Sequence, residues 1–213
     1  MQRASLSEVL QDHRLSINRE LPDDTDVKIQ QFLDLLVKWN DKINLTADKD
    51  PDIMLKKHVF DSLQYLRVLD PDSRVMDIGS GAGFPGLPLK ITCPGITLIL
   101  VESQRKRCSF LETVVRELGL DRVEVINARA EDLSGEHEDR YDKVVFRAVT
   151  SLESCLALGE RFLKPGGTLI VKKPPDEAPC QQSTNLVIKK DIPITSYKGL
   201  VSSLLVYELV ANR

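Results

Sequence analysis

The feature that most constrains the fold is the segment Arg74–Gly86, in which an apolar run ends in Asp77 and leads into closely spaced glycines. Such a segment passes from a strand through a tight turn into a helix, because glycine lets the backbone turn sharply and lets a ligand approach closely. Gly81, Gly83 and Gly86 spell G-x-G-x-x-G, a spacing that does not by itself identify the ligand. The segment therefore predicts an α/β fold with a cofactor site at the turn.

After this segment, short β-rich runs alternate with helical stretches, which is typical of a parallel sheet with crossover helices. Seven strands are predicted, at Arg74–Asp77, Thr97–Val101, Val123–Asn127, Lys143–Phe146, Thr168–Lys172, Asn185–Lys190 and Ser203–Val210. The predicted helices between them are Gly86–Cys93, Arg105–Leu118 and Leu152–Phe162. Gly119 should end the second helix in the left-handed conformation, and Lys164–Gly167 should form a tight turn into the fifth strand. The pattern predicts a Rossmann-like, mostly parallel seven-stranded sheet with helices on both faces.

The first 70 residues show helical periodicity instead. An apolar stripe with the spacing i, i+3, i+4, i+7 and i+10 consists of Ile29, Phe32, Leu33, Leu36 and Trp39. Asp23 or Asp24 is the expected N-cap of this helix, and Asp50-Pro51 should begin another. Further helical signals are Ser5–Asp12 and the apolar face of Val59, Phe60, Leu63 and Leu66. We expect residues 1–70 to form a helical cap on a cofactor-binding domain of residues 71–213, the two making one structural unit.

Composition and charge exclude several classes of protein. The net charge of −3 gives the chain no general attraction for nucleic acid, so an RNA site would have to be a local basic patch. The four cysteines have neither disulfide nor zinc spacing and the three histidines share no metal-ligand spacing, so we expect no metal and a reducing compartment. The chain shows neither a signal peptide nor an apolar stretch of about 20 residues, which predicts a soluble cytoplasmic protein without membrane contact.

The residues around the turn favour S-adenosylmethionine over a nicotinamide cofactor, which the glycine spacing alone would also fit. The carboxylate of Asp77 suits the ammonium of a methionine moiety and would repel a pyrophosphate. Gly79 and Gly81 bring the backbone close to the cofactor. Glu102 ends an apolar strand about 20 residues further on, where an acid accepts hydrogen bonds from both ribose hydroxyls. The alternative for Glu102 is that it only caps the following helix.

Small residues lie beside acids after the third predicted strand, in Asn127–Asp132. Ala130 leaves room for an adenine, and Glu131 and the backbone amides offer groups that can recognise its edge. The alternative is an ordinary acidic helix start, in which Glu131 and Asp132 favour the positive end of the helix dipole.

The residues after the fourth predicted strand bear on the methyl acceptor. Phe146-Arg147-Ala148-Val149 is neither the Asn/Asp-Pro-Pro-aromatic motif of amino-group methyltransferases nor the Pro-Cys of cytosine-carbon enzymes, and the similar Lys173–Asp176 and Pro179-Cys180 follow the fifth strand instead. A ring nitrogen such as guanine N7 carries a lone pair and loses no proton, so it suits a site without a base. Arg147 is expected to bond guanine O6, a phosphate or the cofactor carboxylate, with a surface ion pair as the alternative.

Candidate RNA contacts are the basic clusters, each of which is more often a solvated face than a nucleic-acid site. They are Lys38 with Lys42, Lys56 with Lys57, Arg105 with Lys106 and Arg107, and Lys172 with Lys173. Of these we expect Arg105, Lys106, Arg107 and Lys172 to contact RNA. Trp39 is expected in the core rather than as a platform for base stacking.

Six stretches along nearly the whole chain carry a more specific likeness: Lys38–Thr46, His58–Leu63, Asp77–Pro88, Arg105–Arg107 with Phe110-Leu111, Arg129–Glu131 and Arg147-Ala148. In these stretches the chain resembles the bacterial 16S ribosomal RNA guanine-N7 methyltransferases, also called glucose-inhibited division protein B. The resemblance implies a class I methyltransferase fold with S-adenosylmethionine contacted by Gly79, Phe84, Ala130, Glu131 and Arg147. It also implies that the substrate is a guanine of 16S ribosomal RNA, free or in a small-subunit precursor.

Two stretches depart from the family pattern. Val171–Lys173 stands where relatives commonly have Leu-Lys-Gly, and Ser202–Val206 lacks the arginines often found just before it.

The leading hypothesis is a monomeric enzyme that transfers a methyl group from S-adenosylmethionine to N7 of a 16S guanine. The alternatives are a small-molecule methyltransferase of the same fold and a non-catalytic, cofactor-binding ribosome-assembly protein, with a nicotinamide-dependent dehydrogenase last.

Overall fold

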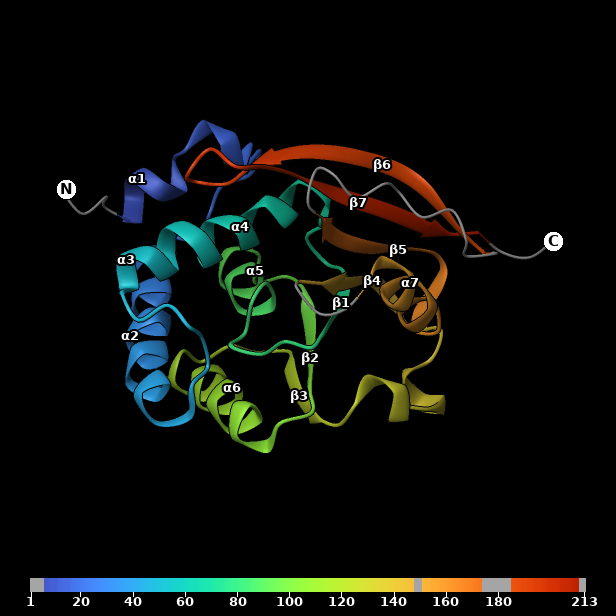
Figure 1. The fold of residues 1–213 in the computed structure, drawn as a ribbon, viewed down its shortest axis with the longest axis horizontal. Helices are drawn as coiled ribbons and strands as arrows, with labels where there is room; N and C mark the ends of the chain where they lie inside the picture. Colours follow the sequence, from blue (N-terminus) through green and yellow to red (C-terminus); the bar gives the residue numbers. More distant parts are fainter. Residues whose placement is uncertain (1–5, 148–150, 174–184, 211–213) are drawn as a thin grey trace.

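A sheet of seven strands forms the middle layer of the described part of the molecule (Figure 1). The computed structural model describes residues 6–147, 151–173 and 185–210. The strands are β1 Arg74–Ile78, β2 Thr97–Glu102, β3 Val123–Asn127, β4 Tyr141–Phe146, β5 Leu163–Lys173, β6 Leu186–Thr195 and β7 Val201–Leu209. Their order is β3-β2-β1-β4-β5-β7-β6, in which β1 to β5 pair in parallel and β7 is antiparallel to β5 and β6. All seven predicted strands are confirmed, although β6 continues beyond the predicted Lys190 to Thr195.

The start of β5 differs from the prediction. Lys164–Gly167, expected as a tight turn before the strand, lies within β5, which already pairs with β4 at Leu163. The register of this pairing shifts between Tyr141 and Lys143 of β4, and Gly166 in the shifted stretch has a φ of 76°. Extra residues in one strand are accommodated as a bulge when a glycine can adopt a positive φ. The glycines therefore do mark an irregular backbone, but it is a bulge within β5 and not the predicted turn before it.

Successive side chains of the strands point into two hydrophobic clusters, one on each face of the sheet. The crossover helices are α5 Gly86–Thr92, α6 Arg105–Glu117 and α7 Leu152–Glu160. Val75 of β1 packs with α5, α6 and the N-terminal helices, whereas its neighbour Met76 packs with α7. The three predicted helices are confirmed, each ending one or two residues earlier than expected. Gly119 follows α6 with the predicted left-handed φ of 60°.

The N-terminal part is helical, as predicted, and lies on the α5 and α6 face (Figure 1). Its elements are α1 Leu6–Leu10, the 3-10 turn η1 His13–Leu15, α2 Thr25–Ile43, α3 Pro51–Met54, the π-helical turn η2 Leu55–Val59, α4 Phe60–Leu63 and the 3-10 turn η3 Gln64–Val68. Asp24 precedes α2 without a side-chain capping bond, whereas Asp50 caps α3 by accepting from the backbone amide of Asp52 at 2.9 Å. We call α3, η2, α4 and η3 together the cap segment. It runs without a break from Pro51 to Val68.

The cap segment crosses the sheet near the carboxyl ends of its central strands. The hydroxyl of Tyr65 donates to the carbonyl oxygen of Phe146, the last residue of β4, at 2.9 Å. Asp61 forms an ion pair with Lys172 near the end of β5. Ligands of open parallel sheets bind beyond the carboxyl ends of the strands. The cap segment is therefore placed beside the expected site.

Candidate cofactor and acceptor site

The turn after β1 is held open by glycines and anchored to β2. Gly79, Gly81 and Gly83 have φ values of 73°, 56° and 87°, which other residues rarely adopt. The backbone amides of Gly79 and Ser80 donate to the carbonyl oxygen of Val101 at 2.9 and 3.1 Å. The backbone conformation thus explains the glycine pattern from which the site was predicted.

Glu102 lies at the end of β2 and is bonded to the same turn. One carboxylate oxygen accepts from the amide of Gly81 at 3.0 Å, and the other accepts from the amide of Gln104 at 2.8 Å. Gln104 is the N-cap residue of α6, so the capping alternative describes part of what Glu102 does. Oε1, which accepts from Gln104, also accepts from the hydroxyl of Ser103 at 3.4 Å, whereas Oε2 has only Gly81 as a hydrogen-bond donor among the described residues. Glu102 can therefore support the turn and still accept from ribose hydroxyls.

Asp77 is buried beneath the turn, with 1% of its surface exposed. Its Oδ2 accepts from the amide of Gly86 at 2.9 Å, which fixes the start of α5, while its Oδ1 has no hydrogen-bond partner within the described residues. Burial raises the pKa of Asp77 to about 7, against the opposing effects of the Gly86 amide and of Arg147. A buried carboxylate oxygen without a partner is costly, so it points to a missing donor or cation.

An open hollow of about 800 Å³ lies beyond the ends of β1, β2, β3 and β4 and is bordered by α7. This volume is within the usual range for a cofactor or small ligand. Of the predicted cofactor residues, Gly79, Glu102, Ala130 and Glu131 line it. Asp77, Gly81, Phe84 and Arg147 do not line it. Gly81 is bonded to Glu102, Arg147 lies on Phe84, and the charge of Arg147 acts on Asp77.

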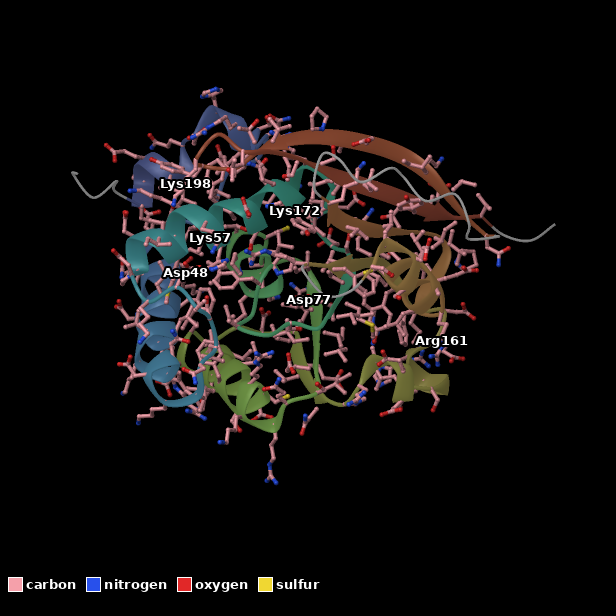
Figure 2. The ribbon with its side chains drawn as sticks, viewed as in Figure 1. Asp48, Lys57, Asp77, Arg161, Lys172 and Lys198 are labelled. Carbon is pink, nitrogen blue, oxygen red and sulfur yellow. The ribbon has the colours of Figure 1, made fainter. Side chains whose placement is uncertain are left out.

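The α7 wall of the hollow was not predicted from the sequence. It contributes Ser154, Ala157 and Leu158, with Arg161 just beyond the helix. The guanidinium of Arg161 donates to the carbonyl oxygen of Leu133 at 2.8 Å and so joins this wall to the loop after β3. Figure 2 shows Arg161 on the opposite side of Asp77 from Asp48 and Lys57. No local motif marks these residues, because only the tertiary fold brings α7 to the cofactor turn.

Arg147 follows β4 and lies on the ring of Phe84, with its guanidinium carbon 5.3 Å from the ring centroid. Its Nη2 is 2.6 Å from Nδ1 of His58 in the cap segment, and the His58 ring lies 5.1 Å from that of Phe84. Among the described residues no carboxylate forms an ion pair with Arg147. The geometry therefore favours a functional guanidinium over the alternative of a surface ion pair.

The predicted RNA-contacting residues are in three different situations. Arg105 and Lys106 are exposed at the start of α6. Arg107 is half-buried, with its guanidinium 3.8 Å from Glu102, and it lines the hollow. Lys172 pairs with Asp61, whose second carboxylate oxygen is buried without a partner. Only Arg105 and Lys106 are thus fully available for a phosphate in this conformation.

The other candidate residues are paired, exposed or packed in the core. Lys56 pairs with Asp52 and Lys57 with Asp48, both at 2.7 Å, while Lys38 and Lys42 are exposed on α2. Trp39 packs against Phe110 at a centroid distance of 5.9 Å, in line with its expected place in the core. The superficially similar Pro-Pro and Pro-Cys stretches after β5 lie outside the described residues.

The described ranges contain neither a cluster of metal ligands nor a membrane-spanning helix. Within them, no three or more His, Cys, Asp and Glu side chains gather as a metal site would require. None of the helices in these ranges combines the length and the apolar character needed to cross a membrane.

The strand order, the antiparallel β7 and the glycine turn after β1 together define a class I methyltransferase fold. Solved structures of this fold agree with the arrangement. TYW2 from Pyrococcus horikoshii in complex with MeSAdo matches with a TM-score of 0.59 and 17% identity over 73% of this chain and 63% of that one. TrmN from Thermus thermophilus matches with a TM-score of 0.57 and 18% identity over 71% of this chain and 49% of that one. The predicted fold class is confirmed.

Sequence comparison identifies the family. The family model "GidB: rRNA small subunit methyltransferase G" matches residues 25–204. Ribosomal RNA small subunit methyltransferase G of Alkaliphilus oremlandii is 40% identical over 80% of this chain and 73% of its own length, and that of Desulfitobacterium hafniense is 42% identical over 75% and 67%. The chain belongs to this family. The predictions of a small-subunit rRNA methyltransferase and of S-adenosylmethionine as its methyl donor are thereby confirmed.

Proposed function

We propose that the methyl acceptor is N7 of one guanine in 16S ribosomal RNA. The observation that carries this proposal is Arg147 at the end of β4, where many methyltransferases place a base or a nucleophile. A guanidinium donates hydrogen bonds and does not accept a proton. Guanine N7 needs no base, because its lone pair attacks the methyl carbon while the carbon–sulfur bond breaks. Arg147 can orient the base through O6 or through a phosphate.

The residues around the hollow fit S-adenosylmethionine. The partnerless Oδ1 of Asp77 is suited to the ammonium of the methionine moiety, and the second lone pair of Glu102 Oε2 to a ribose hydroxyl, while Oε1 can accept from another in exchange for Ser103. Gly79 and Gly81 let the backbone approach the ligand, and Ala130 and Glu131 border space for the adenine. When bound, the donor supplies an electrophilic methyl group on a sulfonium. The protein holds this group in line with the acceptor nitrogen.

The RNA contacts follow from the position of the basic residues. Arg105 and Lys106 are exposed next to the hollow that Arg107 lines, so an RNA strand at the acceptor site would meet them through its phosphates. Lys172 would join them only by exchanging Asp61 for a phosphate. We further propose that the enzyme is a monomer, which light scattering of the purified protein would test. We expect it to act in the cytoplasm.

Methylation of RNA from a strain lacking this gene tests the proposal directly. The purified enzyme and labelled S-adenosylmethionine are incubated with naked 16S RNA, with 30S subunits and with 23S RNA as the control. We expect label in a single 16S guanine. Borohydride reduction followed by aniline should cleave the RNA at this guanine, because N7-methylation makes its ring easier to reduce and the base easier to lose. Label at another atom, or none in either 16S substrate with cofactor binding intact, would refute the proposal.

A further inference from the structure

A chain of two short hydrogen bonds joins the cap segment to the end of β4. Nε2 of His58 lies 2.8 Å from Oδ2 of Asp48, and Nδ1 of the same ring lies 2.6 Å from Nη2 of Arg147. Asp48 belongs to the loop before α3, His58 belongs to η2, and Arg147 directly follows β4. The imidazole therefore bridges a carboxylate just before the cap segment and the guanidinium that we place at the acceptor.

The donors and acceptors fix the state of this ring. A guanidinium can only donate, so Nδ1 of His58 must accept from Arg147 and carries no proton. A neutral imidazole then has its proton on Nε2, which donates to Asp48 at 2.8 Å in preference to Thr46 Oγ1 at 3.4 Å. The bridge therefore requires a neutral His58 in the Nε2–H tautomer, and Asp48 selects this tautomer.

The surroundings of His58 favour the same state. Its side chain is 14% exposed, and burial, followed by the charge of Arg147, lowers its pKa. Asp48 acts in the opposite direction, and Lys57 on the same turn weakens that effect by pairing with Asp48 at 2.7 Å. The Phe84 ring lies against both His58 and Arg147. These are the charged groups that face the ring from its own turn, from the preceding loop and from β4.

We infer that His58, oriented by Asp48, is a positioning residue that holds the Arg147 guanidinium on Phe84 for the methyl acceptor. Arg147 is joined to the cap by a hydrogen bond whose acceptor is one nitrogen lone pair. Without that lone pair the guanidinium keeps its stacking on Phe84 and the attraction of the Asp61 and Asp77 carboxylates, but it has no hydrogen bond to fix its orientation among the described residues. The inference rests on the proposed role of Arg147. It adds that a residue from the helical cap, 89 positions away in the sequence, sets the geometry of the site.

Two variants of similar size separate this role from simple anchoring of the cap. In His58→Asn the side-chain oxygen replaces Nδ1 and still accepts from Arg147, but the contact with Asp48 is lost. In His58→Gln the amide nitrogen replaces Nε2 and still donates to Asp48, but the acceptor for Arg147 is lost. We expect His58→Gln to lower kcat about 10- to 100-fold, with the KM for S-adenosylmethionine little changed, and His58→Asn to lose several-fold less. Equal effects, or a larger loss in His58→Asn, would overturn the inference.

A spectroscopic measurement on the unmodified protein needs neither variant to be active. Long-range proton–nitrogen correlation spectra of protein labelled with 15N-histidine report which ring nitrogen carries the proton. His13 and His137 give the other two signals, and the signal missing from His58→Asn identifies His58. We expect the Nε2–H tautomer at pH 7. A proton on Nδ1, or on both nitrogens, would overturn the inference.

The pH dependence of kcat adds an independent check. A protonated ring has no lone pair for Arg147, so kcat should fall as the pH drops through the pKa of His58, and this acid limb should disappear in His58→Asn. An identical acid limb in that variant contradicts the inference. If the enzyme methylated no 16S guanine, the proposed function would fail while the tautomer measurement still decided the state of His58.

Discussion

The cofactor side and the cap side of the site are built in different ways. On the cofactor side Gly79, Glu102 and Ala130, each close after a strand, border an open hollow of about 800 Å³. On the cap side, side chains from distant parts of the chain are joined by ion pairs and hydrogen bonds, as in Asp61 with Lys172. Backbone geometry thus shapes the site for the donor, whereas paired side chains shape the site for the acceptor. Substitutions on the cofactor side should therefore affect the binding of S-adenosylmethionine, and substitutions on the cap side should affect turnover and stability.

The largest effect should come from Gly79→Val on the cofactor side. A branched side chain cannot adopt the φ of 73° without strain and would occupy the space that the cofactor needs. Calorimetric titration should show an affinity for S-adenosylmethionine reduced by about 1,000-fold or more, which is about 4 kcal/mol. Gly199→Val is a matched control, because Gly199 has a φ of 85° and open space around an added Cβ. Binding by Gly79→Val within a few-fold of the unmodified protein would contradict the placement of the cofactor.

The next effect concerns the stability of the cap side. Lys172→Met leaves the Asp61 carboxylate, in a side chain only 10% exposed, without its cation. Removing one partner of a buried pair costs about 3 kcal/mol. Urea unfolding should show this loss, and the double variant with Asp61→Leu should recover most of it. Similar stability of single and double variants would mean that the pair is solvated and that the cap side is more open than described.

The sequence predicts the cofactor side well because its signals are local. The strand, glycine turn and acid around Asp77 lie within a few residues of one another, so spacing alone identifies them. The bridge from His58 to Arg147 spans 89 positions and the pair of Lys172 with Asp61 spans 111, so no window of the sequence contains either. The α7 wall with Arg161 escaped prediction for the same reason. The bulge around Gly166 was missed because glycine serves turns and bulges equally.

Arg147→Ala tests whether the cap side serves turnover. We expect kcat to fall about 100-fold because the acceptor loses its orientation, while the affinity for S-adenosylmethionine changes only a few-fold. Arg116→Ala is the control, since that arginine is 70% exposed on α6 and pairs only with its neighbour Glu117 among the described residues. Loss of folding without a specific loss of turnover would assign Arg147 a structural role instead.

The smallest effect concerns the boundary between the two sides, where Asp77 lies. Binding an ammonium at Oδ1 requires the ionised carboxylate, whose pKa is raised to about 7. Below that pH, binding must release a proton, so the affinity should fall by up to about tenfold per pH unit. The stability of the protein without ligand depends on pH in the opposite direction. Because the pKa of Asp77 is higher in the folded than in the unfolded protein, its contribution to stability is complete below pH 3.8 and is lost as the pH rises through 7.

Titrations of S-adenosylmethionine in buffers of different ionisation enthalpy measure the proton release on binding. Asp77→Asn, which can still accept from Gly86, should bind more weakly and release no proton. An unchanged proton release in that variant would place the titrating group elsewhere and leave Asp77 only its role in holding the start of α5.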